Sequence, residues 1–264
     1  PFSTPNSKLQ MFNQQMSPKF AKTLTQSKAD TLIHLGFTIQ HGRNKDEATS
    51  NNIRCLENAL TTCHYASINH IVYLSSTTVY GPRIDNPELI TETDPLRPIK
   101  GFQYAHDKVT AEKKLEAFAS AHSQAMITTL RSSIVMGPSA NNFITKALFK
   151  PLLMGIKGFD PPMQFIHEED LTNILSWFIH HPRSGTFNVA APGSVKYSQL
   201  MSMSGKRFYW LPASLAYRLT DLSWFFRLQN DSNSTGLEFI RHPWVTSTRK
   251  LVYECGYSFQ FSSE

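Results

Sequence analysis

The chain has 264 residues, of which 41% are hydrophobic and 17% charged, and its formal net charge is +6. This size and composition are typical of a globular protein with one large domain or slightly more. No apolar run of about eighteen residues occurs, so no membrane span is predicted. The Lys and Arg residues are scattered, which argues against nucleic-acid binding and favours nucleotide-sized anions. Three cysteines without CxxC spacing favour reduced thiols and a cytoplasmic location.

Short apolar runs alternate with amphipathic segments along the first 190 residues. The pattern predicts strands at 8–13, 31–35, 70–75, 126–138, 164–167 and 185–190. It predicts helices beginning at Ser17, at 52–64, at 103–121 and after a cap at Asp170. Between 81 and 100 four prolines exclude a regular element. This alternation predicts an α/β protein with a parallel sheet wound on both faces.

Polar side chains follow the strand at 70–75, where a parallel sheet opens onto a site. Ser76 stands at this strand end, and Gly36 ends the strand before it, where the absence of a Cβ lets a ligand approach the backbone. Tyr104 and Lys108 are four residues apart, so in a helix they share one face. A phenol beside an ammonium and facing a hydroxyl is suited to proton transfer.

Six motifs occur in the order found in the extended short-chain dehydrogenase/reductase family, which includes nucleotide-sugar epimerases and dehydratases: DTLIHLG, NIRCLENAL, LSSTTVYG, YAHDK, LRSSIVMGP and FIHEED. The chain resembles this family over roughly residues 8–260. The resemblance implies a Rossmann-like, doubly wound parallel sheet with a smaller C-terminal substrate-binding lobe. It implies a dinucleotide-binding domain at 1–139 and 164–190, and a lobe at 140–163 and 191–264.

The resemblance also implies roles for individual residues. Tyr104 is expected to be the acid/base, with a pKa lowered by Lys108 and by the positive nicotinamide ring. Ser76 is expected to hold the reacting substrate oxygen, and Asn52 to position water or the lysine unless it only caps a helix. The residues expected to contact NAD or NADP, with NAD favoured, are His34, Leu35, Gly36, Leu74, Ser75, Tyr104, Lys108, Arg131, Ser133 and Ile134. The residues expected to contact the substrate are Ser76, Thr77, Thr78, Asn141, Asn142 and Arg241.

The sequence departs from the family pattern in two places, and both affect what we expect of the protein. The GxxGxxG turn that precedes the first helix of the family is missing, so we expect the natural protein to have an upstream segment carrying it. Thr77 and Thr78 occupy the positions of the acidic pair expected in a sugar dehydratase, which argues against 4,6-dehydration. No metal-ligand spacing or serine-hydrolase elbow is present.

The resemblance therefore favours an NAD(P)-dependent epimerase/oxidoreductase acting on a nucleotide-sugar, 4-epimerase-like. The alternatives are a ketone reductase or hydroxysteroid-type dehydrogenase and, from another class, a binding relative without catalysis. By family analogy, we expect a homodimer formed through the helices at 52–64 and 103–121.

One aromatic-rich segment, residues 211–228, is left without a role by the resemblance. Such a helix can lie on a membrane surface or line the site of an apolar substrate. The more common arrangement is that it covers the core of its own lobe, and this is the expectation we adopt.

Overall fold

The computed structural model describes residues 28–38, 45–142, 145, 152–229 and 232–264, together with Lys22, Thr25 and Gln26. The strand predicted at 8–13 and the helix predicted from Ser17 lie outside the described residues.

A four-stranded parallel sheet forms the centre of the described chain, in the order β1-β2-β3-β8. Its strands are β1 (Thr31–His34), β2 (His70–Ser76), β3 (Met126–Ser132) and β8 (Gly185–Val189). Strand β2 lies between β1 and β3, with Tyr73 paired to His34 on one side and to Thr129 on the other. The carboxyl ends of these strands meet at one edge of the sheet, which is where such sheets bind ligands.

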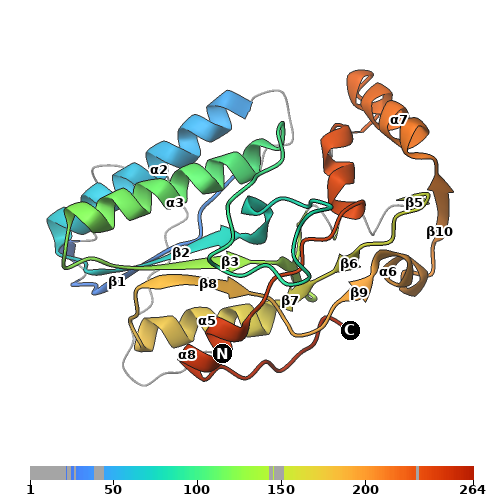
Figure 1. Ribbon diagram of the computed structural model, residues 1–264. Helices are drawn as coiled ribbons and strands as arrows, with labels where there is room; N and C mark the ends of the chain where they lie inside the picture. Colours follow the sequence, from blue (N-terminus) through green and yellow to red (C-terminus); the bar gives the residue numbers. More distant parts are fainter. Residues whose placement is uncertain are drawn as a thin grey trace.

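Helices cover both faces of this sheet (Figure 1). On one face lie α2 (Lys45–Ala66) and α3 (Gln103–Ala121), and on the other lie α5 (Glu168–His180) and α8 (Arg249–Cys255). Leu56 and Leu115 pack on Ile71 in the first core layer. Phe178 packs with Phe187 in the second. The prediction of a Rossmann-like, doubly wound α/β fold is confirmed.

Two predicted helix starts were wrong. Helix α2 begins at Lys45, so Asn52 lies about two turns inside it and is not a helix cap. Helix α5 begins at Glu168, and its cap is His167, whose Nδ1 accepts a hydrogen bond from the backbone N–H of Glu169 at 3.3 Å.

Asp170 serves a different purpose from the predicted cap. Its carboxylate is fully buried and accepts a hydrogen bond from the Tyr257 hydroxyl at 2.8 Å and others from the backbone N–H groups of Gln260 and Phe261. Asp170 therefore ties the last segment of the chain to α5.

The strand predicted at 126–138 is divided at Ser133. The backbone N–H of Ser133 still bonds to Val189 O at 2.9 Å, but the next strand, β4 (Ile134–Met136), leaves the main sheet and pairs with β7 (Phe165–His167). The turn after β4 requires Gly137, because φ is +151° and an added Cβ would lie 2.5 Å from the Glu168 side chain.

A second group of elements lies beyond the carboxyl ends of the main strands (Figure 1). Its elements are β5 (Leu152–Ile156), β6 (Pro162–Met163), β9 (Val195–Lys196), α6 (Tyr197–Met203), β10 (Arg207–Leu211), α7 (Ala213–Phe225) and η2 (Ser234–Ile240). Strand β10 pairs in parallel with β5, and β6 pairs antiparallel with β9.

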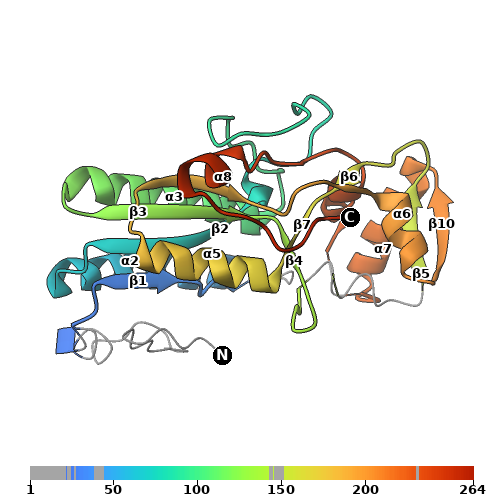
Figure 2. The same cartoon turned by 90° about the horizontal axis from the view of Figure 1, so that it is seen from below.

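Helix α8 returns to the main sheet, as Figure 2 also shows. Leu251 and Cys255 belong to the same core cluster as Phe187 of β8, and the Lys250 ammonium donates to Thr186 O at 2.9 Å. We keep the expected division into a dinucleotide-binding domain and a substrate-binding lobe as a proposal. These contacts, however, assign the segment from Arg249 onward to the dinucleotide-binding domain and not to the lobe.

Candidate active site

The hydroxyl of Ser76 lies at the carboxyl end of β2, where the strand passes into the short helix η1 (Thr77–Val79). Its Oγ accepts hydrogen bonds from the backbone N–H of Thr78 at 3.3 Å and from the Thr78 hydroxyl at 3.0 Å. These contacts fix its rotamer. Ser76 also lies close enough to the Tyr104 phenol to act on its pKa, in the direction that lowers it, so the structure brings the predicted serine and tyrosine together.

Tyr104 and Lys108 lie in the first turns of α3, on the side that faces β2. The Lys108 ammonium donates to the backbone carbonyl of Leu74 at 2.7 Å and lies 5.6 Å from the centre of the Tyr104 ring. The predicted spacing therefore produces the predicted grouping of Ser76, Tyr104 and Lys108.

The surroundings of Lys108 are mostly aromatic. Its side chain is 3% exposed, and Nζ lies 3.9 Å from the centre of the Phe37 ring and 4.8 Å from that of Tyr73. Burial lowers the pKa of Lys108 to about 7, against the opposing effect of the Glu112 carboxylate. Near neutral pH the lysine can therefore exist in both its charged and its neutral form.

The pKa of Tyr104 moves in the direction opposite to the expected one. Burial raises the pKa of the phenol to about 12, although the nearby Ser76 hydroxyl acts to lower it. In the chain alone Lys108 does not overcome the cost of desolvating a phenolate. Lowering this pKa requires a further positive charge at the site.

The end of β1 contributes a group of predicted cofactor residues. His34 is buried, and neither of its ring nitrogens has a hydrogen-bond partner among the described residues. Burial and the nearby Lys108 charge lower its pKa to about 4. Leu35 and Gly36 are exposed, and within the described part of the chain nothing apart from the neighbours of Gly36 in sequence lies within 4 Å of the position of a Cβ on this glycine. This leaves open space beside the backbone where the prediction expects a ligand.

Several buried polar atoms at this sheet edge have no partner in the described chain. They are the Tyr73 hydroxyl, the Thr77 hydroxyl and the Ser133 hydroxyl, together with both ring nitrogens of His34. Unsatisfied buried polar groups are costly, so their concentration at strand ends is typical of a site that takes a polar ligand. The residues present fit a dinucleotide in this respect. Ile134, in β4, is partly buried next to Ser133.

Asn52 has a role that the sequence did not reveal. Its side-chain Oδ1 accepts from the backbone N–H of Thr38 at 2.8 Å, and its Nδ2 donates to Thr38 O at 3.0 Å. These two bonds hold the segment that follows β1, including Phe37, against α2. Asn52 therefore positions the wall of the site, and its contact with water or with the lysine stays a prediction.

A buried ion pair lies behind the strand ends. Arg131 and Glu112 are 5% and 3% exposed and meet at 2.7 Å between Nη2 and Oε2. Arg131 Nη1 also donates to the Tyr80 hydroxyl at 2.7 Å, and the Tyr80 hydroxyl donates to Asn188 Oδ1 at 2.8 Å. Ser75 donates to Glu112 Oε1 at 2.5 Å.

In this network Arg131 and Ser75, which were both predicted to contact the cofactor, form hydrogen bonds with other side chains of the protein. A cofactor contact by the Arg131 guanidinium or the Ser75 hydroxyl would have to break these bonds. We therefore expect both side chains to support the site from behind. Sequence reasoning missed Glu112, although it lies one helical turn beyond Lys108, because nothing in the sequence pairs it with Arg131.

The predicted substrate residues of the expected substrate-binding lobe lie in two places. Asn142 follows β4, where its Nδ2 donates to Val135 O at 2.6 Å and its Oδ1 accepts from the Thr145 N–H at 3.1 Å, while Asn141 beside it is exposed. Arg241 follows η2, where Nη1 donates to the Tyr217 hydroxyl at 3.2 Å and lies 3.9 Å from Glu238 Oε1. A role of both places in binding one substrate stays a prediction.

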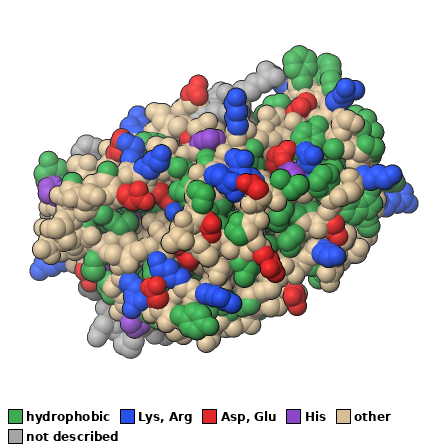
Figure 3. Space-filling model, in the orientation of Figure 1, with side chains coloured by type: hydrophobic (Ala, Val, Ile, Leu, Met, Phe, Trp, Pro, Cys, Tyr) green, Lys and Arg blue, Asp and Glu red, His purple; other side chains and the backbone are tan. Residues whose placement is uncertain are grey.

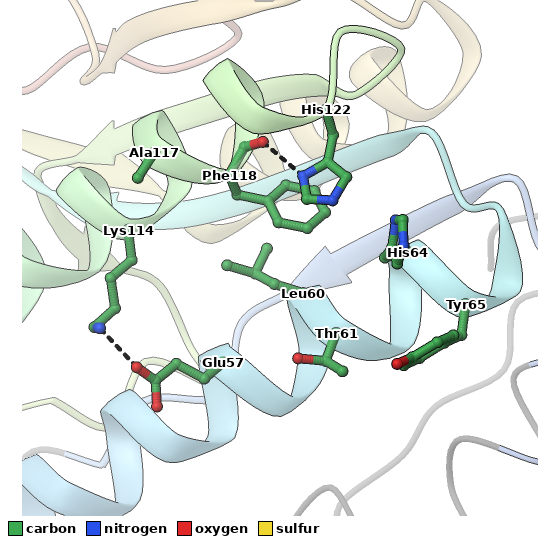
Figure 4. A pocket seen from close by; sticks show the side chains of 9 residues that line it. All are labelled: Glu57, Leu60, Thr61, His64, Tyr65, Lys114, Ala117, Phe118 and His122. Carbon is green, nitrogen blue, oxygen red and sulfur yellow. Dashed lines mark hydrogen bonds and ion pairs between the residues drawn. The ribbon is translucent and has the colours of Figure 1, made fainter.

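An open cavity of about 340 Å³ lies on α2 and α3, toward their C-terminal ends (Figure 4). Tyr104 lies in the first turn of α3, at the other end of that helix. The walls of the cavity include Leu60, Phe118 and the rings of His64 and His122, whose centres are 4.6 Å apart. It contains none of the predicted site residues. No group of three or more His, Cys, Asp or Glu side chains suited to a metal occurs among the residues that the structure describes.

Residues 8–190 match the model of the NAD dependent epimerase/dehydratase family. The chain belongs to this family. Among curated proteins, an uncharacterized protein of Mycobacterium tuberculosis is 24% identical over 247 residues, which cover 91% of this chain and 65% of that protein. A protein of Mycobacterium bovis matches equally well. The chain thus spans less than two thirds of the length of these relatives.

Solved structures of the family share the fold. The UDP-glucose 4-epimerase of Thermus thermophilus, in complex with NAD, is 13% identical with a TM-score of 0.70, covering 94% of this chain and 78% of that one. The dTDP-glucose 4,6-dehydratase of Bacillus anthracis, also with NAD, has the same identity and TM-score and covers 95% and 74%. No helix among the described residues is long and apolar enough to cross a membrane.

Proposed function

We propose that this epimerase/dehydratase family member is an NAD-dependent 4-epimerase of a nucleotide-sugar. The observation that carries the proposal is the grouping of Ser76, Tyr104 and Lys108 at the carboxyl end of β2. A serine hydroxyl and a tyrosine hydroxyl that lie close together can hold one substrate oxygen between them and move its proton.

In this proposal, Tyr104 is the acid/base and Ser76 orients the reacting oxygen. Lys108, held by Leu74 O at 2.7 Å, adds positive charge beside the phenol when it is protonated. The bound nicotinamide ring supplies the hydride acceptor and donor. The residues that would hold the cofactor are His34, Leu35, Gly36, Leu74, Lys108, Ser133 and Ile134. NAD is preferred to NADP on the family resemblance.

Thr77 and Thr78 support epimerisation rather than dehydration. Neither side chain can act as an acid or take a carbon-bound proton near neutral pH, and the Thr78 hydroxyl is bonded to Ser76 at 3.0 Å. We propose that they line the substrate site beside Ser76, with Asn141, Asn142 and Arg241 contributing from the second unit.

One observation favours the runner-up, a ketone reductase or hydroxysteroid-type dehydrogenase. Glu238 lies within ion-pair distance of both Arg241, at 3.9 Å, and His242, at 3.5 Å. This carboxylate offsets the positive charge that a substrate diphosphate would require. An uncharged substrate would not need that charge.

The bound cofactor and the turnover separate these functions. We expect the purified full-length protein to retain NAD, detected chromatographically after denaturation, and to interconvert UDP-glucose and UDP-galactose without added cofactor. Reduction of a ketone with NADPH, without retained NAD, would support the runner-up instead. If the full-length protein binds no dinucleotide, both enzymatic proposals are wrong and a binding protein remains.

We also propose a homodimer formed by the outer faces of α2 and α3. The apolar walls of the cavity in Figure 4 support this, since they lie on that surface.

A further inference from the structure

Helix α7 has apolar side chains both on its buried side and on its exposed side. Its inner face includes Ala216, which is fully buried and packs in a core cluster with Ile156 and Leu237. The expectation that this segment covers the core of its unit is therefore correct for one face only.

The outer face of α7 is an exposed apolar stripe. Four residues form it, and their exposed fractions are 44%, 47%, 54% and 62%: Leu215, Leu219, Leu222 and Phe226. With 3.6 residues per turn, these positions fall within about 60° of one another around the helix axis. Ala216, at about 100° from Leu215, faces the interior.

Neighbouring residues enlarge this stripe. Phe225 is 69% and Leu228 78% exposed, and Tyr209 of β10, the strand that leads into α7, is 54% exposed. Figure 3 shows hydrophobic side chains gathered over α7 and β10, with Lys and Arg side chains at the margin. A continuous exposed apolar surface of this kind ordinarily marks an interaction site.

The charged residues around the stripe are mainly basic. Arg207, Arg218 and Arg227 are all exposed. The one acidic residue in α7, Asp221, is engaged with the backbone N–H and hydroxyl of Ser234 at 2.9 and 3.0 Å. The surface is therefore complementary to anions.

We propose that the outer face of α7 binds the surface of an anionic phospholipid bilayer. The leucine and phenylalanine side chains would enter the acyl boundary, and Arg218 and Arg227 would reach the lipid phosphates, the arrangement expected of an interfacial amphipathic helix. A second copy of the chain fits less well, because a symmetric contact through this face would oppose two sets of arginines. This binding is independent of the proposed function.

Vesicle flotation tests the proposal. The full-length protein should float with vesicles of phosphatidylcholine and phosphatidylglycerol in equal parts, and less with phosphatidylcholine alone. Leu219→Glu with Leu222→Glu should weaken partitioning at least about tenfold, because two apolar contacts are lost and two negative charges gained.

The matched control is Ile84→Glu with Leu89→Glu. These residues are 81% and 44% exposed in the loop between η1 and α3, so the control makes the same change of charge on another surface. It should float like the wild type. Equal loss in both variants would mean that only net charge matters, and this would overturn the proposal.

Two further measurements test the role of the arginines and the integrity of the fold. Arg218→Glu with Arg227→Glu should abolish the preference for anionic over neutral vesicles, and circular dichroism should give every variant the thermal midpoint of the wild type. If the wild type does not float, the proposal is wrong. If it instead forms a dimer that Leu219→Glu with Leu222→Glu abolishes, the face belongs to a second copy of the chain.

Discussion

Two tyrosines lie beside the Lys108 ammonium, and Tyr104 is the one that we propose as the acid/base. The centres of their rings are 4.8 Å from Nζ for Tyr73 and 5.6 Å for Tyr104. Ser76 lies close enough to the Tyr104 phenol to act on its pKa, whereas the buried hydroxyl of Tyr73 has no hydrogen-bond partner in the described chain. The difference lies in the hydroxyl contact and not in the distance from the lysine.

Tyr104→Phe should lower kcat at least about 100-fold, because it removes an acid/base group while keeping the ring. Retained NAD should be unchanged. Tyr253→Phe, at an 81%-exposed position of α8, is the control, and we expect its kcat to be unchanged. Steady-state epimerisation assays measure both, and an unchanged kcat in Tyr104→Phe would mean that another group moves the proton.

Lys108 should make stability depend on pH. Its pKa is about 7 in the folded chain and 10.5 when unperturbed, so the unfolded state binds more protons between these values. The destabilisation is therefore complete below about pH 7 and is relieved as the pH rises toward about 10.5.

Lys108→Met, which keeps most of the side-chain volume, removes this cost. We expect it to be more stable than the wild type by several kcal/mol, on the order of 3–5, at about pH 6, and by much less at about pH 10. Urea unfolding of the cofactor-free proteins at both pH values measures the difference in the free energy of unfolding between the variant and the wild type. The same difference at both pH values would contradict a lowered pKa of Lys108.

At the scale of elements, the Glu112–Arg131 pair joins α3 to β3. Glu112→Gln leaves the 5%-exposed Arg131 without its counter-charge, so we expect a loss of about 3–5 kcal/mol in the free energy of unfolding. Glu57→Gln is the matched control, because Glu57 pairs at 2.6 Å with Lys114 on the surface of the same helix pair and should cost no more than about 1 kcal/mol. Chemical denaturation gives both free energies of unfolding. Similar losses in the two variants would show that the buried pair contributes no more to stability than the surface pair.

The helices and strands also show which structural features can be predicted from the sequence. The run His70–Ser76 and the spacing of Tyr104 and Lys108 are local patterns, and the structure contains the expected strand and helix with both side chains on one side. The break at Ser133 was missed because leaving one sheet for another depends on a distant partner, β7.

The site shows the same division between local and distant contacts. Phe37 lies 3.9 Å from Lys108 Nζ, although 71 positions separate the two in the chain, and Asn52 reaches back to Thr38. Such contacts are set by packing and not by spacing. The direction of the Tyr104 pKa shift was unpredictable for the same reason, since burial sets it.

At the scale of the whole molecule, the two faces of the main sheet have different surroundings. The exposed side of α2 and α3 carries the cavity lined by Leu60 and Phe118, whereas on the other face Asp170 joins α5 to the segment that follows α8. The α2 and α3 side is therefore the one whose partly apolar cavity supports the proposed dimer.

The proposed dimer gives a direct test of this asymmetry. Thr61 and Ala117 are exposed beside the cavity, on α2 and α3 respectively. Thr61→Arg with Ala117→Arg should yield a monomer in sedimentation velocity at concentrations where the wild type is a dimer, because like charges would meet across a symmetric interface. Val252→Arg with Tyr253→Arg makes the same addition of charge on exposed α8 and should remain dimeric. A wild type that is monomeric throughout, or a dimer that only the α8 variant disrupts, would remove α2 and α3 from the interface.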